Sequence, residues 1–401
     1  MCRKNAVLYI IMAMVLSCAL ILGACDKGTE APDETAPTGT MIDESLDPYV
    51  IGGVFSITGR ASFLGEPERN SMELFSDIVN ENGGINGHKL EVIIYDDEGD
   101  PTNTVINVKK LIEKDNVLAI VGPSLSGNTL GVIDTVEEKE VPLISCAASI
   151  KITSPVKPWV FKTPQTDEHA VEKIYEYLAN EGIKKIAIIT VSNGYGDSGK
   201  EQLKSQAEEA GVTIVAEESY GEEDSDMTAQ LTNIKGTDAE AIVCWGTNPG
   251  PAIIAKNIVQ LGIELPLIQS HGVASPSYIE YAGDASNGNI LPTGKILIID
   301  QLPKSDVQYD ALKEYRELYE AAYESEVSGF GGYAWDAMGI IALALETSGA
   351  DRAALRDAIE GTTDFVGVSG VFNMSPEDHT GLTKDAFVIV VIEDGGWKIV
   401  E

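Results

Sequence analysis

The sequence is poor in the residues from which disulfide scaffolds, metal centres and many catalytic sites are built. It has 5 cysteines in 401 residues, and only Cys146 and Cys244 lie beyond residue 25. So few cysteines exclude a disulfide-based fold, and these two are expected to be buried as small apolar side chains. The 4 histidines lack the spacing of metal ligands, and no His-Glu-x-x-His or Gly-x-Ser-x-Gly motif occurs. The sequence therefore indicates neither a metal site nor an enzyme.

Basic residues are scarce as well. Lys and Arg number 28 against 63 Asp and Glu, which gives a net charge of −35. A surface this acidic repels phosphate backbones, so binding to nucleic acid is excluded. The chain is 44% hydrophobic, which supports sizeable cores and excludes wholesale disorder. Its length suggests two or three domains.

The first 24 residues are predicted to be an export signal. A basic start precedes an apolar run over residues 6–22, and the segment Leu22-Gly23-Ala24-Cys25 follows at its end. This order is typical of a cleaved secretory signal, and an uncleaved anchor helix is the alternative. The last four residues resemble a bacterial lipobox, which implies that Cys25 is lipidated and holds the protein to a membrane. Residues 25–47 are acidic and without apolar periodicity, so we expect a flexible tether.

Strand-like and helix-like segments then alternate in two successive runs. In the first run, strands are expected at 49–56, 89–95, 117–121 and 141–145, and helices at 67–82, 101–115 and 129–140. The pattern breaks over 147–166. In the second run, strands are expected at 185–191, 212–216, 241–245 and 265–269, and helices at 168–180, 198–210, 227–234 and 251–261. This alternation predicts an α/β fold with two doubly wound parallel sheets.

The C-terminal part has helices but no sheet of its own. Helices are expected at 307–325, 333–347 and 352–359, followed by a strand hairpin at 386–392 and 397–400. We expect the helices to complete the first lobe and the hairpin to return to the second. Lobe 1 is then 48–165 with 296–382, and lobe 2 is 166–295 with 383–401. Because ligands bind beyond the carboxyl ends of strands in such sheets, two facing lobes predict a cleft.

A glycine-rich motif, Gly194-Tyr195-Gly196-Asp197-Ser198-Gly199-Lys200, offers a nucleotide-binding alternative. It fits Gly-x-Gly-x-x-Gly, but Ser192-Asn193 separates it from the strand where the dinucleotide fingerprint needs a tight turn. It also fits a phosphate loop, except that Glu201 stands where a hydroxyl should bind magnesium. A nicotinamide-dependent enzyme is therefore the remote alternative, and we favour a cleft loop that presents Tyr195.

Two other loops have the chemistry of a ligand site. Residues 122–129 follow a strand, open a helix and are rich in hydroxyls, so Ser126 and nearby amides could bind a carboxylate. Alternatively, Ser126 or Asn128 simply caps that helix. Residues 145–149 are small, which would let backbone approach a ligand, or would merely form a tight loop.

Several linked segments resemble a known family. These are IGGVFSITGRASFLGE, NGGINGHKLEVIIYDDEGDP, VLAIVGPSLSG, VPLISCAAS and WVFKTPQTD. They are similar to the solute-binding proteins of ABC importers, above all the leucine/isoleucine/valine-binding family with the type I periplasmic-binding fold. The resemblance implies two lobes joined by a three-strand hinge, a ligand trapped between them, and no catalysis or cofactor.

The resemblance also implies a set of ligand-binding residues. The carboxylate-binding loop corresponds to Ser126, the small-residue loop to Ala147, Ala148 and Ser149, the cleft aromatic to Tyr195, and the acid near the first hinge to Asp167. At other positions the chain departs from the family. The first-loop tyrosine is Leu64, preceded by Phe63; a second-lobe tyrosine is Thr247; the acid that binds ammonium is His271; and the usual disulfide positions hold Gly99 and Leu125.

These features together predict a monomeric, extracytoplasmic substrate-binding protein of an ABC importer, lipid-anchored on the outer face of a bacterial cytoplasmic membrane and partnered by a permease. The expected ligand is a branched-chain or other apolar amino acid, or a related small hydrophobic carboxylate. Because an imidazole is a poor partner for ammonium, a benzoate-like aromatic carboxylate is the alternative ligand. A ligand-sensing domain of a signalling protein is the alternative function.

Overall fold

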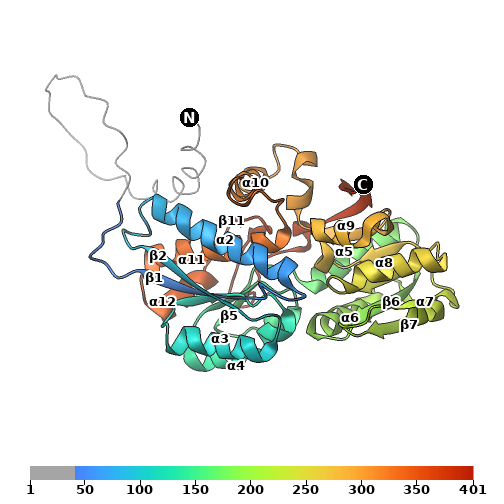
Figure 1. Ribbon diagram of the computed structural model, residues 1–401, viewed down its shortest axis with the longest axis horizontal. Coiled ribbons are helices and arrows are strands. Elements are labelled where there is room, and N and C mark those ends of the chain that lie inside the picture. The colour runs from blue at the N-terminus through green and yellow to red at the C-terminus, as the bar shows by residue number, and fades with distance from the viewer. Residues whose placement is uncertain (1–40, 401) are drawn as a thin grey trace, which may run out of the picture.

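Two separate β-sheets organise the chain, one in each half of the molecule (Figure 1). A computed structural model describes residues 41–400; the predicted signal, Cys25 and most of the predicted tether lie outside the described residues. The first sheet has the order β2-β1-β3-β4-β5 and is parallel throughout. The second has the order β14-β13-β10-β9-β8-β6-β7 and is parallel except along β13. The predicted fold class, two doubly wound α/β lobes, is confirmed.

The strands are short and mostly buried. Their bounds are β1 Tyr49–Phe55, β2 Leu90–Asp96, β3 Ala119–Val121, β4 Leu143–Ser145, β5 Val160–Lys162, β6 Lys185–Val191, β7 Thr213–Tyr220, β8 Ala241–Trp245, β9 Leu267–Gln269, β10 Ile290–Thr293, β11 Phe365–Val366, β12 Val371–Phe372, β13 Val388–Glu393 and β14 Gly396–Ile399. Runs such as KIAIITV in β6 are almost wholly apolar, because helices cover both faces of the sheet.

The helices pack on both faces of each sheet. Their bounds are α2 Ser62–Glu81, α3 Pro101–Glu113, α4 Ser126–Lys139, α5 Asp167–Asn180, α6 Gly194–Ala207, α7 Thr228–Lys235, α8 Gly250–Leu261, α9 Pro276–Ala282, α10 Tyr309–Tyr323, α11 Gly329–Ser348 and α12 Arg352–Glu360. Helices α3 and α4 share a core on one face of the first sheet, and α2, α10, α11 and α12 share one on the other. Among residues 41–400, no helix combines the length and apolarity needed to cross a lipid bilayer.

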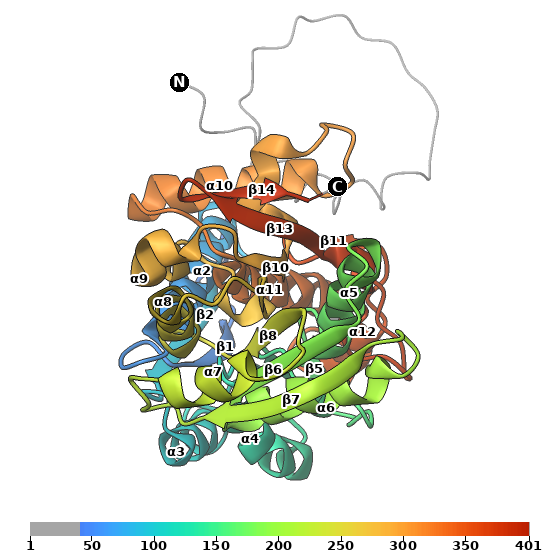
Figure 2. The ribbon, with the colours of Figure 1, turned by 90° about the vertical axis from the view of Figure 1, so that its right-hand side faces the viewer.

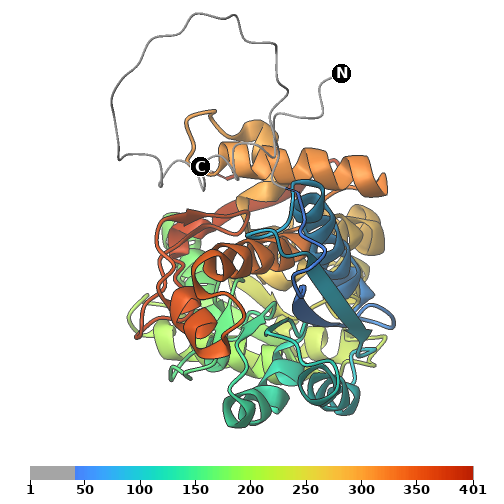
Figure 3. The ribbon, with the colours of Figure 1, turned by 90° about the vertical axis from the view of Figure 1, so that its left-hand side faces the viewer.

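The C-terminal part of the chain is divided between the lobes. Helix α11 is almost entirely buried and lies against α2 over the first sheet, as Figure 3 shows with α11 in orange-red and α2 in blue. The hairpin β13–β14 instead extends the second sheet, where Ile290 of β10 pairs with Val391 of β13 (Figure 2). The chain therefore passes between the lobes after β5, after β10 and before β13, three crossings that could serve as a hinge.

Four helices begin three or more residues earlier than predicted: α2, α4, α6 and α11, the last at Gly329 instead of 333. Helix α2 begins at Ser62, although Pro67 had suggested a start there. Pro67 is the sixth residue of α2, so the helix forgoes the hydrogen bond to the Phe63 carbonyl there, and Gly65 in the turn before it packs directly on the Ser56 backbone. Likewise α4 begins at Ser126 and α6 at Gly194, so two of the predicted loops are helix N-termini.

The end of the predicted tether is held against the first lobe. The Asp43 N–H donates to the Gly87 carbonyl at 2.9 Å, and His88 Nδ1 lies 2.7 Å from the Asp47 carbonyl. Asp43 and Asp47 of the expected tether thus contact the first lobe, and the flexible tether over residues 25–47 stays a prediction. The acidic composition suggested solvation, but a turn at 84–88 supplies the Gly87 carbonyl and the His88 side chain as their partners.

Candidate functional site

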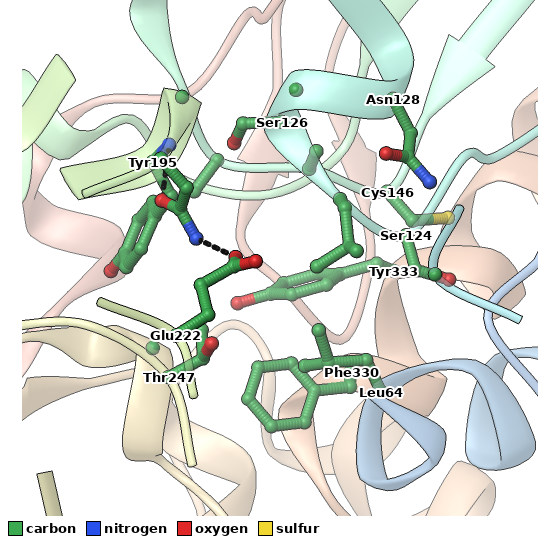
Figure 4. A pocket seen from close by; sticks show the side chains of 18 of the residues that line it. Leu64, Ser124, Ser126, Asn128, Cys146, Tyr195, Glu222, Thr247, Phe330 and Tyr333 are labelled. Carbon is green, nitrogen blue, oxygen red and sulfur yellow. Dashed lines mark hydrogen bonds between the residues drawn. The ribbon is translucent and has the colours of Figure 1, made fainter. Parts of the chain in front are cut away.

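A cavity of about 270 Å³ lies between the two lobes, at the carboxyl ends of their strands. Figure 4 shows side chains from both lobes around it. The lining residues are Leu64, Gly99, Pro101, Ser124, Leu125, Ser126, Gly127, Asn128, Cys146, Ala147, Ala148, Asn193, Gly194, Tyr195, Glu222, Thr247, His271, Gly272, Phe330 and Tyr333. Most of this wall is apolar or aromatic, with few polar groups, which is typical of a small-molecule site.

The N-terminus of α4 provides the polar end of the cavity. Its N-cap residue is Leu125, which supplies no side-chain hydrogen bond. The first-turn N–H groups of a helix have no intrahelical partner. Neither Ser126 nor Asn128 caps α4, so no capping side chain bonds these groups instead. These groups and the positive end of the helix dipole favour an anion such as a carboxylate.

A buried network fixes this helix end. Asn128 Nδ2 donates to Asp97 Oδ2 at 3.0 Å, and the same carboxylate accepts from Ser56 Oγ at 2.7 Å and Thr104 Oγ1 at 2.8 Å. Asp97 is fully buried and follows β2 directly. It therefore joins the ends of β1 and β2 to α4, and it positions α4 without facing the cavity.

The small-residue loop 146–149 lies beside α4 and is held from beneath. The Ser149 N–H donates to Ser126 Oγ at 3.3 Å, and the buried Lys162 ammonium donates to the Ala148 carbonyl. Burial lowers the pKa of Lys162 to about 7, and the negative charge of Asp167 offsets part of this shift. The loop therefore holds the Ser126 side chain in place.

The second lobe contributes Tyr195 and His271, which meet edge to face with centroids 5.7 Å apart. Burial lowers the pKa of His271 to about 3, so its imidazole is neutral at physiological pH. Its Nδ1 lies 3.4 Å from the Tyr195 hydroxyl, and its Nε2 has no partner within residues 41–400. A neutral, buried imidazole offers no charge to a ligand.

Contacts between the two lobes show that they are closed on each other. Arg60 of the first lobe pairs with Glu223 of the second, and Lys151 Nζ lies 2.5 Å from Glu201 Oε2. A Cβ added to Gly194 would lie 3.1 Å from the Gly127 Cα, so the N-termini of α6 and α4 touch.

Comparisons with known proteins agree with this geometry. A family model described as "Periplasmic binding protein" matches residues 48–396. The chain belongs to the periplasmic binding protein family. Among curated relatives, the leucine-, isoleucine-, valine-, threonine- and alanine-binding protein of Pseudomonas aeruginosa is 27% identical over 311 residues, which cover 77% of this chain and 80% of that protein.

Solved structures give the same result. An extracellular ligand-binding receptor from Rhodopseudomonas palustris superimposes with a TM-score of 0.83 at 26% identity, over 88% of this chain and 99% of that one. A branched-chain amino acid transporter substrate binding protein from Streptococcus pneumoniae, solved with isoleucine, gives 0.79 at 23% identity, over 88% and 99%. The second likeness is one of fold. The type I periplasmic binding fold predicted from the sequence is confirmed.

This periplasmic binding protein brings most of the predicted site residues to the cavity. Leu64, Ser126, Ala147, Ala148, Tyr195, Thr247 and His271 line it, whereas Phe63, Ser149 and Asp167 do not. Phe63 packs edge-on against Phe330, with ring centroids 5.7 Å apart. Ser149 Oγ donates to Ser198 Oγ at 2.7 Å, and Asp167 Oδ1 accepts from the Ile150 N–H at 3.0 Å. Both therefore support the wall from behind.

Sequence reasoning missed three prominent wall residues of this binding protein, Glu222, Phe330 and Tyr333. Glu222 belongs to an acidic loop after β7 that looked like ordinary solvated surface. Phe330 and Tyr333 lie on α11, some 200 residues beyond the first-lobe loops they face. The glycines and aromatics that open α11 were the only signal, because an almost wholly apolar helix gives no indication of which face lines a cavity.

The glycine-rich motif of this binding protein serves packing. A Cβ on Gly196 would lie 1.7 Å from the Val191 carbonyl oxygen, and one on Gly199 would lie 2.2 Å from the Trp245 ring. Asn193 Oδ1 accepts from the Tyr195 and Gly196 N–H groups at 3.0 and 2.9 Å. The amides that a phosphate would need are therefore already bonded.

The two cysteines of the described chain are free and buried, as expected, Cys146 beside the cavity and Cys244 in β8. The positions of the family's usual disulfide remain neighbours, since a Cβ on Gly99 would lie 3.7 Å from Leu125 Cδ1. Within residues 41–400, no group of His, Cys, Asp or Glu side chains is arranged to hold a metal ion.

Proposed function

We propose that this protein is the extracytoplasmic receptor of an ABC importer and binds an apolar amino acid or a small hydrophobic carboxylate between its lobes. The observation that carries the proposal is the uncapped N-terminus of α4, which opens into an apolar cavity between closed lobes. The ligand carboxylate would accept hydrogen bonds from the first-turn amides of α4 and from Ser126. Its side chain would pack against Leu64 and Phe330.

In this proposal, closure of the two lobes tells the permease that ligand is bound. A ligand that contacts both lobes stabilises the closed form by as much as it binds that form more tightly than the open one. The three chain crossings permit such a hinge motion, and a permease would recognise the closed face. The relatives named as leucine-, isoleucine- and valine-binding proteins support this ligand class.

The location and assembly follow from the sequence. We propose that residues 1–24 direct export, that Cys25 carries the lipid anchor, and that the receptor works as a monomer beside its permease. The lobes would comprise 48–165 with 296–382 and 166–295 with 383–401. Contacts between α11 and α2, and between β10 and β13, support this division.

A calorimetric ligand screen tests the proposal. Leucine, isoleucine, valine, phenylalanine and benzoate are titrated into the purified protein, and at least one is expected to bind. Ser126→Ala should weaken that binding about tenfold to a hundredfold, because a hydrogen bond to a charged group contributes about 1.5–3 kcal/mol. Ser205→Ala, which removes an exposed hydroxyl on α6 away from the cavity, is the matched control. Failure of every compound to bind would refute the proposal.

A further inference from the structure

One acidic side chain lines the cavity within the described residues, and it is not at the family's expected position. That side chain is Glu222, from the loop after β7, and no Lys or Arg of residues 41–400 accompanies it. At the expected position stands His271, which is buried and neutral. Among the lining residues, Glu222 is therefore the one negatively charged partner for a positive charge on a ligand.

Glu222 is oriented by Asn193. The Asn193 side chain uses its Oδ1 to accept from two N–H groups of α6, which turns its Nδ2 toward the second-lobe loop. Nδ2 donates to Glu222 Oε1 at 2.5 Å, and Figure 4 draws a dashed line that ends at the labelled Glu222 carboxylate. Glu222 Oε2 has no hydrogen-bond partner in the part of the chain that the structure describes. Glu222 is an exposed side chain that this hydrogen bond orients at the cavity wall, and its second carboxylate oxygen is left to accept a hydrogen bond.

An outer chamber of about 280 Å³ continues from the cavity, since Gly99, Leu125, Glu222 and Thr247 line both. Its acidic residues are Glu98, Asp100, Glu222 and Glu223, and its one basic residue, Arg60, is paired with Glu223. The approach to the cavity is therefore negative, which disfavours a ligand that is only an anion. A ligand that also carries a positive charge avoids this penalty.

We propose that Glu222 binds the ammonium group of the ligand, and that the receptor therefore selects α-amino acids over the corresponding simple carboxylates. This inference rests on the proposed function and specifies its ligand. The two charges of the ligand are divided between the lobes: α4 of the first lobe holds the carboxylate, and Glu222 of the second holds the ammonium. A simple carboxylate engages only the first lobe strongly, so it stabilises closure less.

The test compares ligands that differ only in the ammonium group. Leucine is paired with 4-methylpentanoate and phenylalanine with 3-phenylpropanoate, and calorimetry gives the affinity of each for the wild type and for Glu222→Gln. We expect the wild type to bind an amino acid at least about thirtyfold more tightly than its partner. In Glu222→Gln the affinity for the amino acid should fall by about that factor, whereas the affinity for the simple carboxylate should stay the same or rise.

The matched control is Glu218→Gln. Glu218 also accepts a hydrogen bond from an asparagine, Asn233, at 3.1 Å, but it lies outside the cavity. The Glu218→Gln variant should bind both members of each ligand pair with wild-type affinity. Equal affinities within a pair, or an equal loss of both compounds in Glu222→Gln, would overturn the inference while the proposed function stands. If no compound of either class binds the wild type, the proposed function fails and the inference with it.

Discussion

Replacing Gly194 by alanine should weaken ligand binding by hindering closure. In the closed molecule the new methyl would lie 3.1 Å from the Gly127 Cα and 3.2 Å from the Gly127 N, both backbone atoms of the opposite lobe. Neither atom can rotate away, so the lobes must separate by a few tenths of an ångström. Overpacking by one methyl costs about 1–3 kcal/mol in a rigid core. Because the hinge can open slightly to relieve the clash, we expect a cost to ligand binding of about 1–2 kcal/mol. Affinity should then fall about 5- to 30-fold.

The assay combines calorimetry with small-angle scattering of the free and liganded protein. Gly131→Ala is the control, because this glycine lies on α4 and a Cβ there would meet nothing within 4 Å. The ligand-free melting temperature of Gly194→Ala should match the wild type, since the clash exists only in the closed form. Wild-type affinity together with an unchanged closed-state radius would refute the reasoning.

Three further predictions follow from the structure and the sequence. Gly199→Ala places a methyl 2.2 Å from the buried Trp245 ring and should lower the free energy of unfolding by about 3 kcal/mol, as measured by urea denaturation. Burial lowers the pKa of His271 from 6.5 to about 3, so below pH 6.5 the unfolded chain binds a proton that the folded chain does not, and the fold loses stability. Between pH 7 and pH 4, wild type should therefore lose stability relative to His271→Gln; parallel pH profiles would contradict this. Cys25→Ser should move the expressed protein from the membrane to the soluble fraction, and continued membrane attachment would argue for an anchor helix.

The fold could be predicted from the sequence because its signals are local. Apolar strands such as 185–191 alternate with amphipathic helices, and this period alone indicates two parallel sheets. The three-residue strand β5 was missed, because a strand of that length within a proline-rich stretch has no period to detect. Strand β10 was missed as well, since its four residues include a proline.

The site was predictable where a loop follows a strand, as at Ser126 and Ala147. It was not predictable where tertiary structure brings distant residues together, as for Phe330 and Tyr333 of α11. Glu222 shows the same limit, because only its hydrogen bond to Asn193 distinguishes it from the other acids of its loop. Helix starts were also misplaced, because α6 and α4 begin at Gly194 and Ser126, within glycine- and serine-rich segments that look irregular in sequence.

The described chain starts in one sheet and finishes in the other, with β1 in the first and β14 in the second. Fluorescent dyes attached near residues 41 and 400 would therefore lie on opposite lobes. Energy transfer between the two dyes would report the opening and closing of the lobes in real time, without a label near the ligand.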